Sequence, residues 1–309
     1  MLIKKVGIIA NIAKEKSPAC TAALRDWMVA RGIDVYLEER IAAKIGAAHG
    51  VERGKLGSLV DLLVVFGGDG TILRTARLVQ DRDVPIVGIN LGVFGYLTEV
   101  NLGEMYSALE LILAGDFQIE KRMMLDVEIN GGEESHRDGT VLNDVVINRG
   151  NLSRIVELET TVDDRYLTTF KADGLIVATP TGSTAYSLAA GGPIVFPELY
   201  SIIINPICPH TLTNRPIILP EGVEIKVTLW TLEEGATVTL DGQVSFTVKS
   251  GDTIAIRKSR YITTLVSSPH RGYLEILRTK LGWGGSQTGA ARKRQDADGT
   301  EHPEFCHHR

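Results

Sequence analysis

The chain has 309 residues, of which 44% are hydrophobic and 23% are charged, and its formal net charge at pH 7 is −5. That size corresponds to about two domains of ~150 residues each, and the composition is typical of a globular protein with a buried core. The pI of about 5.9 gives no sign of nucleic-acid binding, for which a basic surface and a high pI are expected. No stretch reaches the ~18 consecutive apolar residues of a membrane span, so we expect no membrane partner.

The cysteines and the N-terminal residues are typical of a cytoplasmic protein. A disulfide framework is not expected from three cysteines, Cys20, Cys208 and Cys306, and this favours a reducing compartment. The apolar run 6–13 is short and leads into charged residues rather than into a small-residue cleavage site. It therefore predicts a first β-strand and not a signal peptide, and we expect a cytoplasmic location.

Strands and helices alternate over the first hundred residues or so. Apolar patterns predict strands at 5–10, 33–37, 59–66 and 84–89, and helices at 18–30, 71–79 and 102–113. The run 59–66 is almost continuous in Leu and Val, which is typical of a parallel strand covered on both faces. The alternation predicts βαβ units, a parallel sheet and an α/β domain over residues 1–115.

Beyond residue 115, short predicted strands are separated by turn signals such as Asn130-Gly131-Gly132. The pattern predicts a β-rich, β-sandwich-like domain over 116–266, made of small antiparallel sheets and interrupted by one helix at about 183–190. We expect segment 267–283, with a strand or short helix at 272–280, to pack on the first domain.

The last segment, 284–309, has almost no apolar residues, and its charges are balanced. Such a segment cannot bury enough surface to offset its ordering entropy, so it is predicted to be disordered. His302, His307 and His308 lie there with Cys306. Without a folded scaffold to fix their geometry, a metal site in this segment is not favoured.

The first motif that carries chemistry is Gly67-Gly68-Asp69-Gly70-Thr71, between a hydrophobic strand and a helix. Ligands of open α/β sheets bind at the carboxyl ends of the strands, where glycines admit phosphate oxygens and a helix N-terminus offers N–H donors. Because a carboxylate repels phosphate, Asp69 suggests a base for an attacking hydroxyl, or a group that acts through Mg²⁺. The alternative is a tight turn in which Asp69 only caps the helix.

Several common catalytic patterns are absent from the sequence. Gly54-Lys55 is followed by Leu56, so no Walker A loop is formed, and the motif at 67–71 is not the G-x-G-x-x-G dinucleotide fingerprint. A hydride-transfer dehydrogenase is therefore disfavoured. Acyl transfer lacks support as well, because no Ser-His-Asp or G-x-S-x-G arrangement stands out.

A second polar group lies in segment 171–193, where a predicted strand leads into a turn and then into a short helix that ends at paired glycines. The turn carries four hydroxyl residues, Thr179, Thr181, Ser183 and Thr184. They exceed what one helix cap requires, and the small side chains leave room for a flat ligand beside Tyr186. The alternative is a well-capped core helix with Tyr186 in the core.

Three further features are weaker. Asn143-Asp144 stands at a predicted strand start and could hold a ribose diol or an amide, with a simple turn as the alternative. Asp241-Gly242-Gln243 is typical of a hairpin turn, and the pattern alone assigns it no function. Cys208 and His210 are too few for a zinc site, so a structural His210 is favoured.

In this order the motifs resemble those of NAD kinases, the enzymes that phosphorylate NAD to NADP. The resemblance spans about residues 3–283 and rests on the motifs at 67–71, 143–144, 173–193, 212–216 and 241–243. The first motif is shared with 6-phosphofructokinases and with diacylglycerol or sphingosine kinases, whereas the block 179–186 and the order of the whole set are specific. The implied fold is that of the NAD kinase, 6-phosphofructokinase and diacylglycerol kinase group: an α/β domain with a parallel sheet plus a β-rich domain.

The resemblance implies an active site between the two domains. There ATP, or polyphosphate in some members, donates its terminal phosphoryl group to the 2′-hydroxyl of the adenosine ribose of NAD, with a divalent metal such as Mg²⁺. Asp69 matches the family's catalytic carboxylate, the proposed general base. The positions that match NAD or ligand contacts are Asp69, Gly70, Asn143, Asp144, Arg154, Lys171, Asp173, Thr184, Ala185, Tyr186, Ser187, Leu188, Ala189 and Gln243. Because family members are usually dimers or tetramers, a homo-oligomer is expected.

Two positions depart from the family pattern: Asp144 stands where many members have Glu, and Lys171 where they have Arg. A shorter carboxylate could loosen a ribose contact, and Lys cannot make a bidentate phosphate contact. The alternatives to an NAD kinase are a lipid or sugar kinase of the same superfamily and a non-catalytic NAD-binding sensor. Against the sensor, the sequence retains Asp69, which only turnover requires.

Overall fold

The computed structural model describes residues 3–79, 82–92, 95–131, 137–149, 155–231 and 235–283. The predicted contact residue Arg154 and the tail 284–309 lie outside these ranges. The chain divides into two compact units, residues 1–270 and 271–309. The second unit contains one described helix, α7 (Tyr273–Leu281), which ends at Gly282 in the left-handed conformation (φ 65°). A helix thus forms where the sequence allowed either a strand or a helix.

A parallel sheet forms the first part of the larger unit. Its strands are β1 (Lys5–Ala10), β2 (Asp34–Leu37), β3 (Leu62–Gly67) and β4 (Ile86–Asn90), in the order β4-β3-β1-β2, with the short β5 (Val100–Asn101) on β4. All of these pairs are parallel, as the alternation of strands and helices predicts. The carboxyl ends of the strands therefore share one edge of the sheet, where ligands of such sheets bind.

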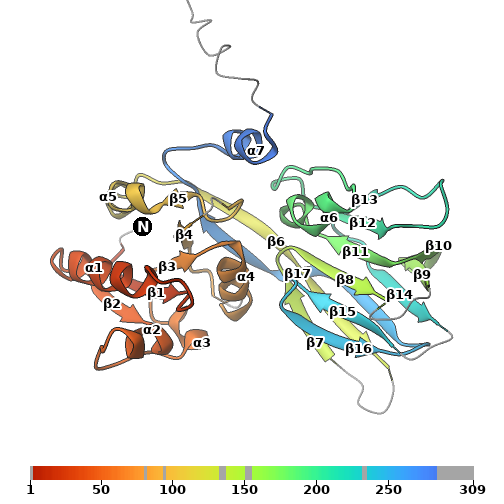
Figure 1. Ribbon diagram of the computed structural model, residues 1–309, viewed down its shortest axis with the longest axis horizontal. Coiled ribbons are helices and arrows are strands. Elements are labelled where there is room, and N and C mark those ends of the chain that lie inside the picture. The colour runs from red at the N-terminus through yellow and green to blue at the C-terminus, as the bar shows by residue number, and fades with distance from the viewer. Residues whose placement is uncertain are drawn as a thin grey trace, which may run out of the picture. The chain divides into compact units, whose positions relative to one another are not determined.

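Helices cover both faces of this sheet (Figure 1). They are α1 (Ser17–Val29), α2 (Glu39–Lys44), α3 (Arg53–Leu56), α4 (Asp69–Leu78), η1 (Leu102–Glu104) and α5 (Met105–Ala114). In β3, Leu62, Val64 and Phe66 share a core with α1, α2 and α5, whereas Leu63 and Val65 share another with α3 and α4. This explains why β3 is apolar at nearly every position. The sequence does not predict α2 and α3, because six and four residues are too few to show a helical period.

The rest of the unit consists of antiparallel strands in two sheets. One sheet has the order β13-β12-β11-β8-β15-β16, and the other continues the parallel sheet in the order β10-β9-β14-β17-β4, with β6 on β17 and β7 on β6. The strands are β6 (Ile119–Asn130), β7 (Arg137–Val141), β8 (Asp144–Asn148), β9 (Val156–Val162), β10 (Arg165–Ala172), β11 (Gly174–Ala178), β12 (Ser201–Ile207), β13 (Ile217–Pro220), β14 (Ile225–Trp230), β15 (Ala236–Leu240), β16 (Val244–Val248) and β17 (Thr253–Val266).

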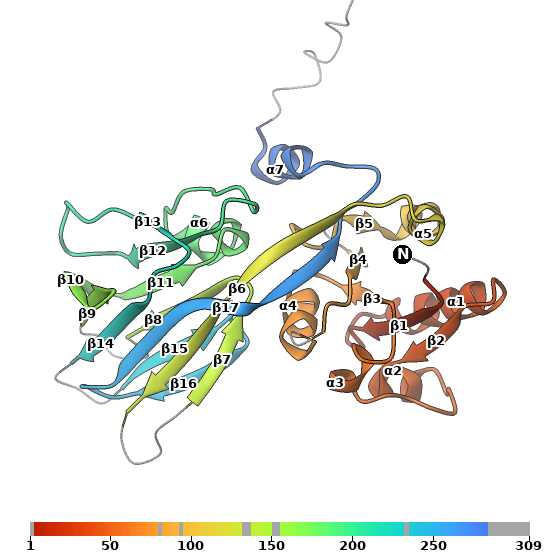
Figure 2. The same ribbon diagram turned by 180° about the vertical axis from the view of Figure 1, so that it is seen from behind.

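One sheet runs from the α/β part into the β-rich part, and this continuity was not predicted from the sequence, which indicated small antiparallel sheets. β17 pairs with β6 along most of its length, and at Leu265 it also pairs in parallel with Ile86 of β4. Both ribbon views show β6 and β17 side by side across this junction (Figures 1 and 2). With 12 and 14 residues, these strands are much longer than the usual ~5–6. Their pairing joins segments far apart in the sequence, which a local pattern cannot reveal.

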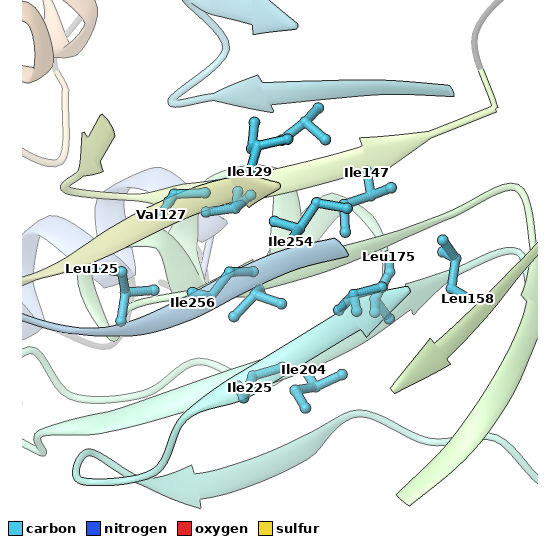
Figure 3. Close-up of a cluster of buried hydrophobic side chains, with 14 of the residues drawn as sticks. Leu125, Val127, Ile129, Ile147, Leu158, Leu175, Ile204, Ile225, Ile254 and Ile256 are labelled. Atoms are coloured by element: carbon cyan, nitrogen blue, oxygen red, sulfur yellow. The ribbon is translucent and has the colours of Figure 1, made fainter. Parts of the chain in front are cut away.

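The core of the β-rich part lies between its two sheets. Alternate residues of β9, β14 and β15 are buried and join one large apolar cluster. Figure 3 shows Leu125 of β6 and Ile254 of β17, from the sheet that continues the parallel sheet, in the same cluster as Leu175 of β11 and Ile204 of β12, from the other sheet. The predicted sandwich-like packing of two sheets is therefore confirmed.

The helix predicted at about 183–190 consists of two shorter elements. η2 (Thr181–Thr184) is followed by α6 (Tyr186–Ala189), and the backbone of Ala185 between them is not helical (φ −98°, ψ −128°). Gly191, in the left-handed conformation (φ 81°), follows the end of α6, as the paired glycines predict. None of the described helices is long and apolar enough to cross a membrane.

Candidate active site

Asp69 is the first residue of α4 and stands at the carboxyl edge of the parallel sheet. Its carboxylate accepts four hydrogen bonds from one loop. Oδ2 accepts from the Tyr96 N–H (2.8 Å), and Oδ1 accepts from the N–H groups of Leu97 and Thr98 and from Thr98 Oγ1 (3.1 Å each). The carboxylate is therefore oriented by a loop remote in sequence rather than used only to cap α4. Oδ2, with one of these bonds, keeps capacity for a further donor.

Glycines allow the segments of this site to approach closely. A Cβ at Gly95 would lie 1.9 Å from Asp69 Oδ1, and one at Gly182 would lie 2.1 Å from the carbonyl oxygen of Asn143. The atoms near Gly182 belong to the backbone, so that position requires glycine, whereas a Cβ at Gly95 would displace the side chains of Asp69 and Thr98 or the loop itself. The loop 95–98 can thus enclose the Asp69 carboxylate, and η2 can lie directly on the start of β8.

A cavity of about 510 Å³ opens at the glycine-rich loop, bordered by the end of β1, the loop 68–71 and Gln243. We call it the basic cavity because all of its charged lining residues are basic. These are Lys14, Arg40, Arg53 and Arg74. Arg53 pairs with Glu38 (3.2 Å), whereas Lys14, Arg40 and Arg74 have no acidic partner within the described part of the chain. The cavity therefore suits a polyanion such as a triphosphate.

A second cavity, of about 290 Å³, lies at the start of β8, and we call it the tyrosine cavity. Its lining residues are Asn143, Asp144, Val146, Asn148, Ala185, Tyr186, Thr239, Asp241 and Gly242. Tyr186 is 43% exposed, so the alternative of a core tyrosine is wrong. Asn143 Oδ1 is buried and has no hydrogen-bond partner among the described residues. A buried polar atom of this kind requires a partner, which a bound ligand can supply.

The carboxyl group of Asp144 is buried at the edge of the tyrosine cavity. Burial and, to a lesser extent, the charge of Asp241 raise the pKa of Asp144 to about 7, against an opposing hydrogen bond from the Tyr186 backbone. Asp144 can therefore carry a proton near neutral pH. In that state it can both donate and accept hydrogen bonds.

Asp241 lines the tyrosine cavity, although its sequence context predicts only a hairpin turn. Its φ of 49° suits a hairpin turn, yet its side chain is fully buried. Oδ1 accepts from the backbone N–H groups of Asn143 (2.8 Å) and Asp144 (3.3 Å). Oδ2 accepts from the Leu142 N–H (3.2 Å) and from Arg77 Nη1 (3.4 Å). The turn after β15 therefore holds the start of β8 in place.

Arg77, close to the C-terminal end of α4, is a second residue missed by sequence reasoning. Its guanidinium also donates to the Leu240 carbonyl (3.2 Å) and to Gln243 Oε1 (2.6 Å). Burial lowers the pKa of Arg77, and the charge of Asp241 opposes that shift. No local signal identifies the pair, because Arg77 and Asp241 are 164 positions apart.

Of the predicted ligand contacts at residues 184–189, some line the tyrosine cavity and others do not. Ala185 and Tyr186 line the tyrosine cavity. Ser187 is fully buried, and its Oγ lies 3.3 Å from Asn205 Nδ2, so its side chain anchors α6. The cavity lining does not include Thr184, Leu188 or Ala189. Gln243, also a predicted contact, lines the basic cavity instead.

Lys171 and Asp173 lie apart from both cavities. Asp173 precedes β11, and the opposite end of that strand, Ala178, pairs with the start of β8. Five residues of strand, or about 17 Å, separate these two ends. The Lys171 side chain forms an ion pair with Glu157 (2.7 Å), and that of Asp173 forms one with Arg149 (3.4 Å). The structure therefore does not bring these two predicted contacts to the cavities of the same chain.

The described residues contain no group of three or more His, Cys, Asp or Glu side chains that could hold a metal ion. The three histidines near Cys306 lie outside the described ranges. Mg²⁺ is commonly held by one or two carboxylates together with substrate phosphates. Asp69 lies between two glycines that line the basic cavity, so its carboxylate could bind a divalent cation that is also bound by the phosphates of a nucleotide.

Comparisons with known proteins cover both parts of the fold. Residues 6–117 match the family model of the ATP-NAD kinase N-terminal domain, and residues 142–268 match that of the ATP-NAD kinase C-terminal domain. The NAD kinase of Geotalea daltonii is 50% identical over 282 residues, which make up 91% of this chain and 99% of that protein. The NAD kinase of Syntrophotalea carbinolica is 47% identical over 287 residues, with the same shares.

Two solved structures share the fold at 24% identity. A yeast NADH kinase complexed with NADH has a TM-score of 0.85 and covers 92% of this chain and 89% of its own. An NAD kinase from Archaeoglobus fulgidus in complex with ATP has a TM-score of 0.71 and covers 91% and 100%. These likenesses confirm the expected combination of an α/β part and a β-rich part.

Proposed function

The chain belongs to the NAD kinase family and phosphorylates NAD to NADP, and we propose that ATP is its donor and Asp69 its general base. The observation that carries the proposal is that two cavities meet at one turn. Gln243 borders the basic cavity, while Asp241 and Gly242 border the tyrosine cavity. The relatives named above are NAD kinases, and the similarity to them spans 91% of this chain. Nothing therefore supports the alternatives of a lipid kinase, a sugar kinase or a non-catalytic NAD-binding sensor.

We place NAD in the tyrosine cavity, with its adenosine ribose at the start of β8. The buried, unpaired Asn143 Oδ1 can accept from a ribose hydroxyl. Asp144 can donate to or accept from the diol according to its protonation. The exposed ring of Tyr186 offers a flat surface on which an aromatic base can stack. In this proposal the predicted β-rich domain, 116–266, supplies the acceptor site.

The triphosphate of ATP belongs in the basic cavity, which the predicted α/β domain, 1–115, supplies apart from Gln243. Lys14, Arg40 and Arg74 can each bind phosphate oxygens, because no carboxylate in the described ranges occupies them. The N-terminus of α4 adds backbone N–H donors and a favourable dipole. A divalent cation bound with the phosphates would neutralise charge on the transferred phosphoryl group.

The proposed role of Asp69 is to act on the hydroxyl that attacks the terminal phosphorus, and it is supported by the two neighbouring residues, Gly68 and Gly70, which line the basic cavity. Its Oδ1 is fixed by three donors, and its Oδ2 can take the proton from the ribose 2′-hydroxyl as the new O–P bond forms and the bond to ADP breaks. General base catalysis of this kind contributes about 10²–10⁴-fold to the rate. Alignment of the two substrates contributes a further, larger share.

The direct test of this function is a coupled assay of the purified chain with NAD, ATP and Mg²⁺, in which an NADP-specific dehydrogenase reports the product. We expect turnover with ATP and compare it with polyphosphate as donor under the same conditions. Turnover with polyphosphate alone would overturn the proposed donor. NAD binding without turnover by either donor would instead favour the sensor.

We also propose a cytoplasmic homo-oligomer. The small number of cysteines supports the location. The position of Asp173, remote from both cavities of its own chain, supports a contact with the ligand of a second copy. Light scattering gives the mass in solution. If the contact is made between copies, mixing inactive Asp69→Asn and Asp173→Ala chains restores activity, because mixed oligomers contain intact sites. No recovery in mixed oligomers would contradict the shared site.

A further inference from the structure

The turn Asp241-Gly242-Gln243 is bonded to both cavities. At the tyrosine cavity, Asp241 holds the backbone N–H groups of residues 142–144. At the basic cavity, Gln243 Nε2 donates to the carbonyl oxygen of Gly70 (2.7 Å), the residue after Asp69. Arg77 donates to both residues of the turn, at Asp241 Oδ2 (3.4 Å) and at Gln243 Oε1 (2.6 Å). Hydrogen bonds thus run without interruption from Gly70 to the start of β8.

This arrangement is more elaborate than a hairpin turn requires. An Asp-Gly pair adopts positive φ at both central positions without any partner for its side chain. Here the Asp241 side chain is fully buried and that of Arg77 is only 14% exposed. A buried carboxylate is costly unless it is paired and hydrogen-bonded, so the ion pair is not explained by the turn alone. What the pair does accomplish is to connect α4, which begins at Asp69, with the backbone that begins β8.

We propose that Arg77, Asp241 and Gln243 form a brace that sets the position of the tyrosine cavity relative to the basic cavity and so aligns the acceptor hydroxyl with the donor phosphate. The inference rests on the proposed placement of NAD and ATP in these cavities. Arg77 and Asp241 are positioning residues, since they act through Gly70 and residues 142–144. A misplacement of about 1 Å can cost about 10²-fold in rate, so a brace of this kind affects turnover directly.

A brace and a substrate contact predict different kinetics. Breaking the brace leaves the basic side chains of the basic cavity and Asn143, Asp144 and Tyr186 of the tyrosine cavity in place, so NAD and ATP still bind, but their reacting atoms no longer align. We therefore expect kcat to fall while both dissociation constants stay nearly the same. A residue that holds NAD or ATP directly would instead raise the dissociation constant or KM of that substrate.

The test uses the full-length chain and four variants. Gln243→Leu breaks the bridge to Gly70 without leaving a buried charge unpaired. Arg77→Lys keeps a positive charge beside Asp241, but it cannot reproduce the contacts of the planar guanidinium. The third variant combines these two substitutions. Arg25→Met, in an exposed ion pair of α1, is the matched control. Thermal unfolding measures the folded fraction, to which every rate is normalised, and calorimetry measures the binding of NAD and of a non-hydrolysable ATP analogue.

We expect Gln243→Leu to lower kcat by about 10²-fold, Arg77→Lys to lower it by about tenfold or more, and both to bind each substrate within about threefold of wild type. The combined variant should be no slower than the slower single variant, because both break one connection. Wild-type kcat in folded Gln243→Leu, or a loss confined to the KM of one substrate, would overturn the brace. Absence of turnover in the wild-type chain would instead overturn the proposed function.

Discussion

Glu99 is a buried carboxyl group beside the site that takes no part in the proposed chemistry. Its Oε2 accepts the backbone N–H of Ser268 (2.8 Å), and the residue is only 7% exposed. Burial is the main cause that raises the pKa of Glu99 to about 7, and the Ser268 hydrogen bond opposes the shift. Burial also raises the pKa of Asp241, but Arg77 and three backbone donors oppose that shift, whereas Glu99 has a single backbone donor. Glu99 therefore makes stability depend on pH.

The sign of that dependence follows from linkage. The folded-state pKa of about 7 exceeds the ordinary value of 4.5, so the native chain retains a proton that the unfolded chain releases. The stabilisation is complete below about pH 4.5 and is lost as the pH rises through about 7. At about 1.4 kcal/mol per pKa unit, Glu99 costs wild type on the order of 3 kcal/mol at pH 8.

Glu99→Gln should remove this cost, because an amide does not ionise. Its advantage in unfolding free energy over wild type should grow from nearly zero at pH 4.5 to about 3 kcal/mol at pH 8. Urea denaturation at several pH values measures the difference, and Glu110→Gln, at an exposed ion pair, should keep the wild-type slope. Parallel pH profiles for Glu99→Gln and wild type would exclude the titration.

Single residues differ in how far the sequence could predict their place in the site. Asp69 could be singled out from the sequence because a carboxylate within a glycine-rich loop has a chemical use, and the two glycines beside it line the basic cavity. Tyr186 was predicted to contact the ligand and is exposed at a cavity. The roles of Asp241 and Arg77 were not predicted. An aspartate in a hairpin and an arginine in a helix are common, and their ion pair forms only in the folded chain.

Helix α4 is the element that connects the parts of the site. The helix begins at Asp69. Arg74, in the middle of the helix, lines the basic cavity, and Arg77, near its end, donates a hydrogen bond to Asp241 in the turn after β15. The helix itself was predicted from its apolar spacing and its position after a buried strand. What its polar face contacts could not be predicted, because those partners come from the β-rich part.

The loop that encloses Asp69 allows a test with a matched control. Gly95→Ala would place a methyl group 1.9 Å from Asp69 Oδ1, so the loop or the carboxylate must shift and the carboxylate loses its orientation. We expect kcat to fall by about 10²-fold or more. A Cβ at Gly92, three residues earlier in the chain, meets nothing within 4 Å, so Gly92→Ala should stay within about twofold of wild type. Equal kcat values for the two variants would contradict the role of the loop.

Arg74 tests the assignment of the donor cavity. A charge-assisted hydrogen bond contributes about 1.5–3 kcal/mol, so Arg74→Met should raise the KM for ATP by about tenfold or more. The dissociation constant for NAD should change little, because Arg74 does not line the tyrosine cavity. Steady-state kinetics with each substrate varied in turn gives both values. An increase in the KM for NAD alone would reverse the assignment of the two cavities.

On the scale of the whole molecule, one sheet extends through the α/β part and the β-rich part of the larger unit. β17 pairs with β4 of the parallel sheet and with β6 and β14 of the antiparallel strands. The two classes of structure were predicted from the change in pattern near residue 115. Their junction was not, because β17 is interrupted by an irregularity between Lys258 and Ile262 and its partners lie far away in the sequence.

The central claim, that this fold places Asp69 as the base for NAD phosphorylation, is tested most directly by Asp69→Asn. We predict a kcat lower by about 10²–10⁴-fold and a dissociation constant for NAD within a few-fold of wild type. Circular dichroism verifies that the variant is folded, and Asp26→Asn, at an exposed aspartate, should retain full activity. Folded Asp69→Asn with normal NAD binding and near-wild-type kcat would contradict the account.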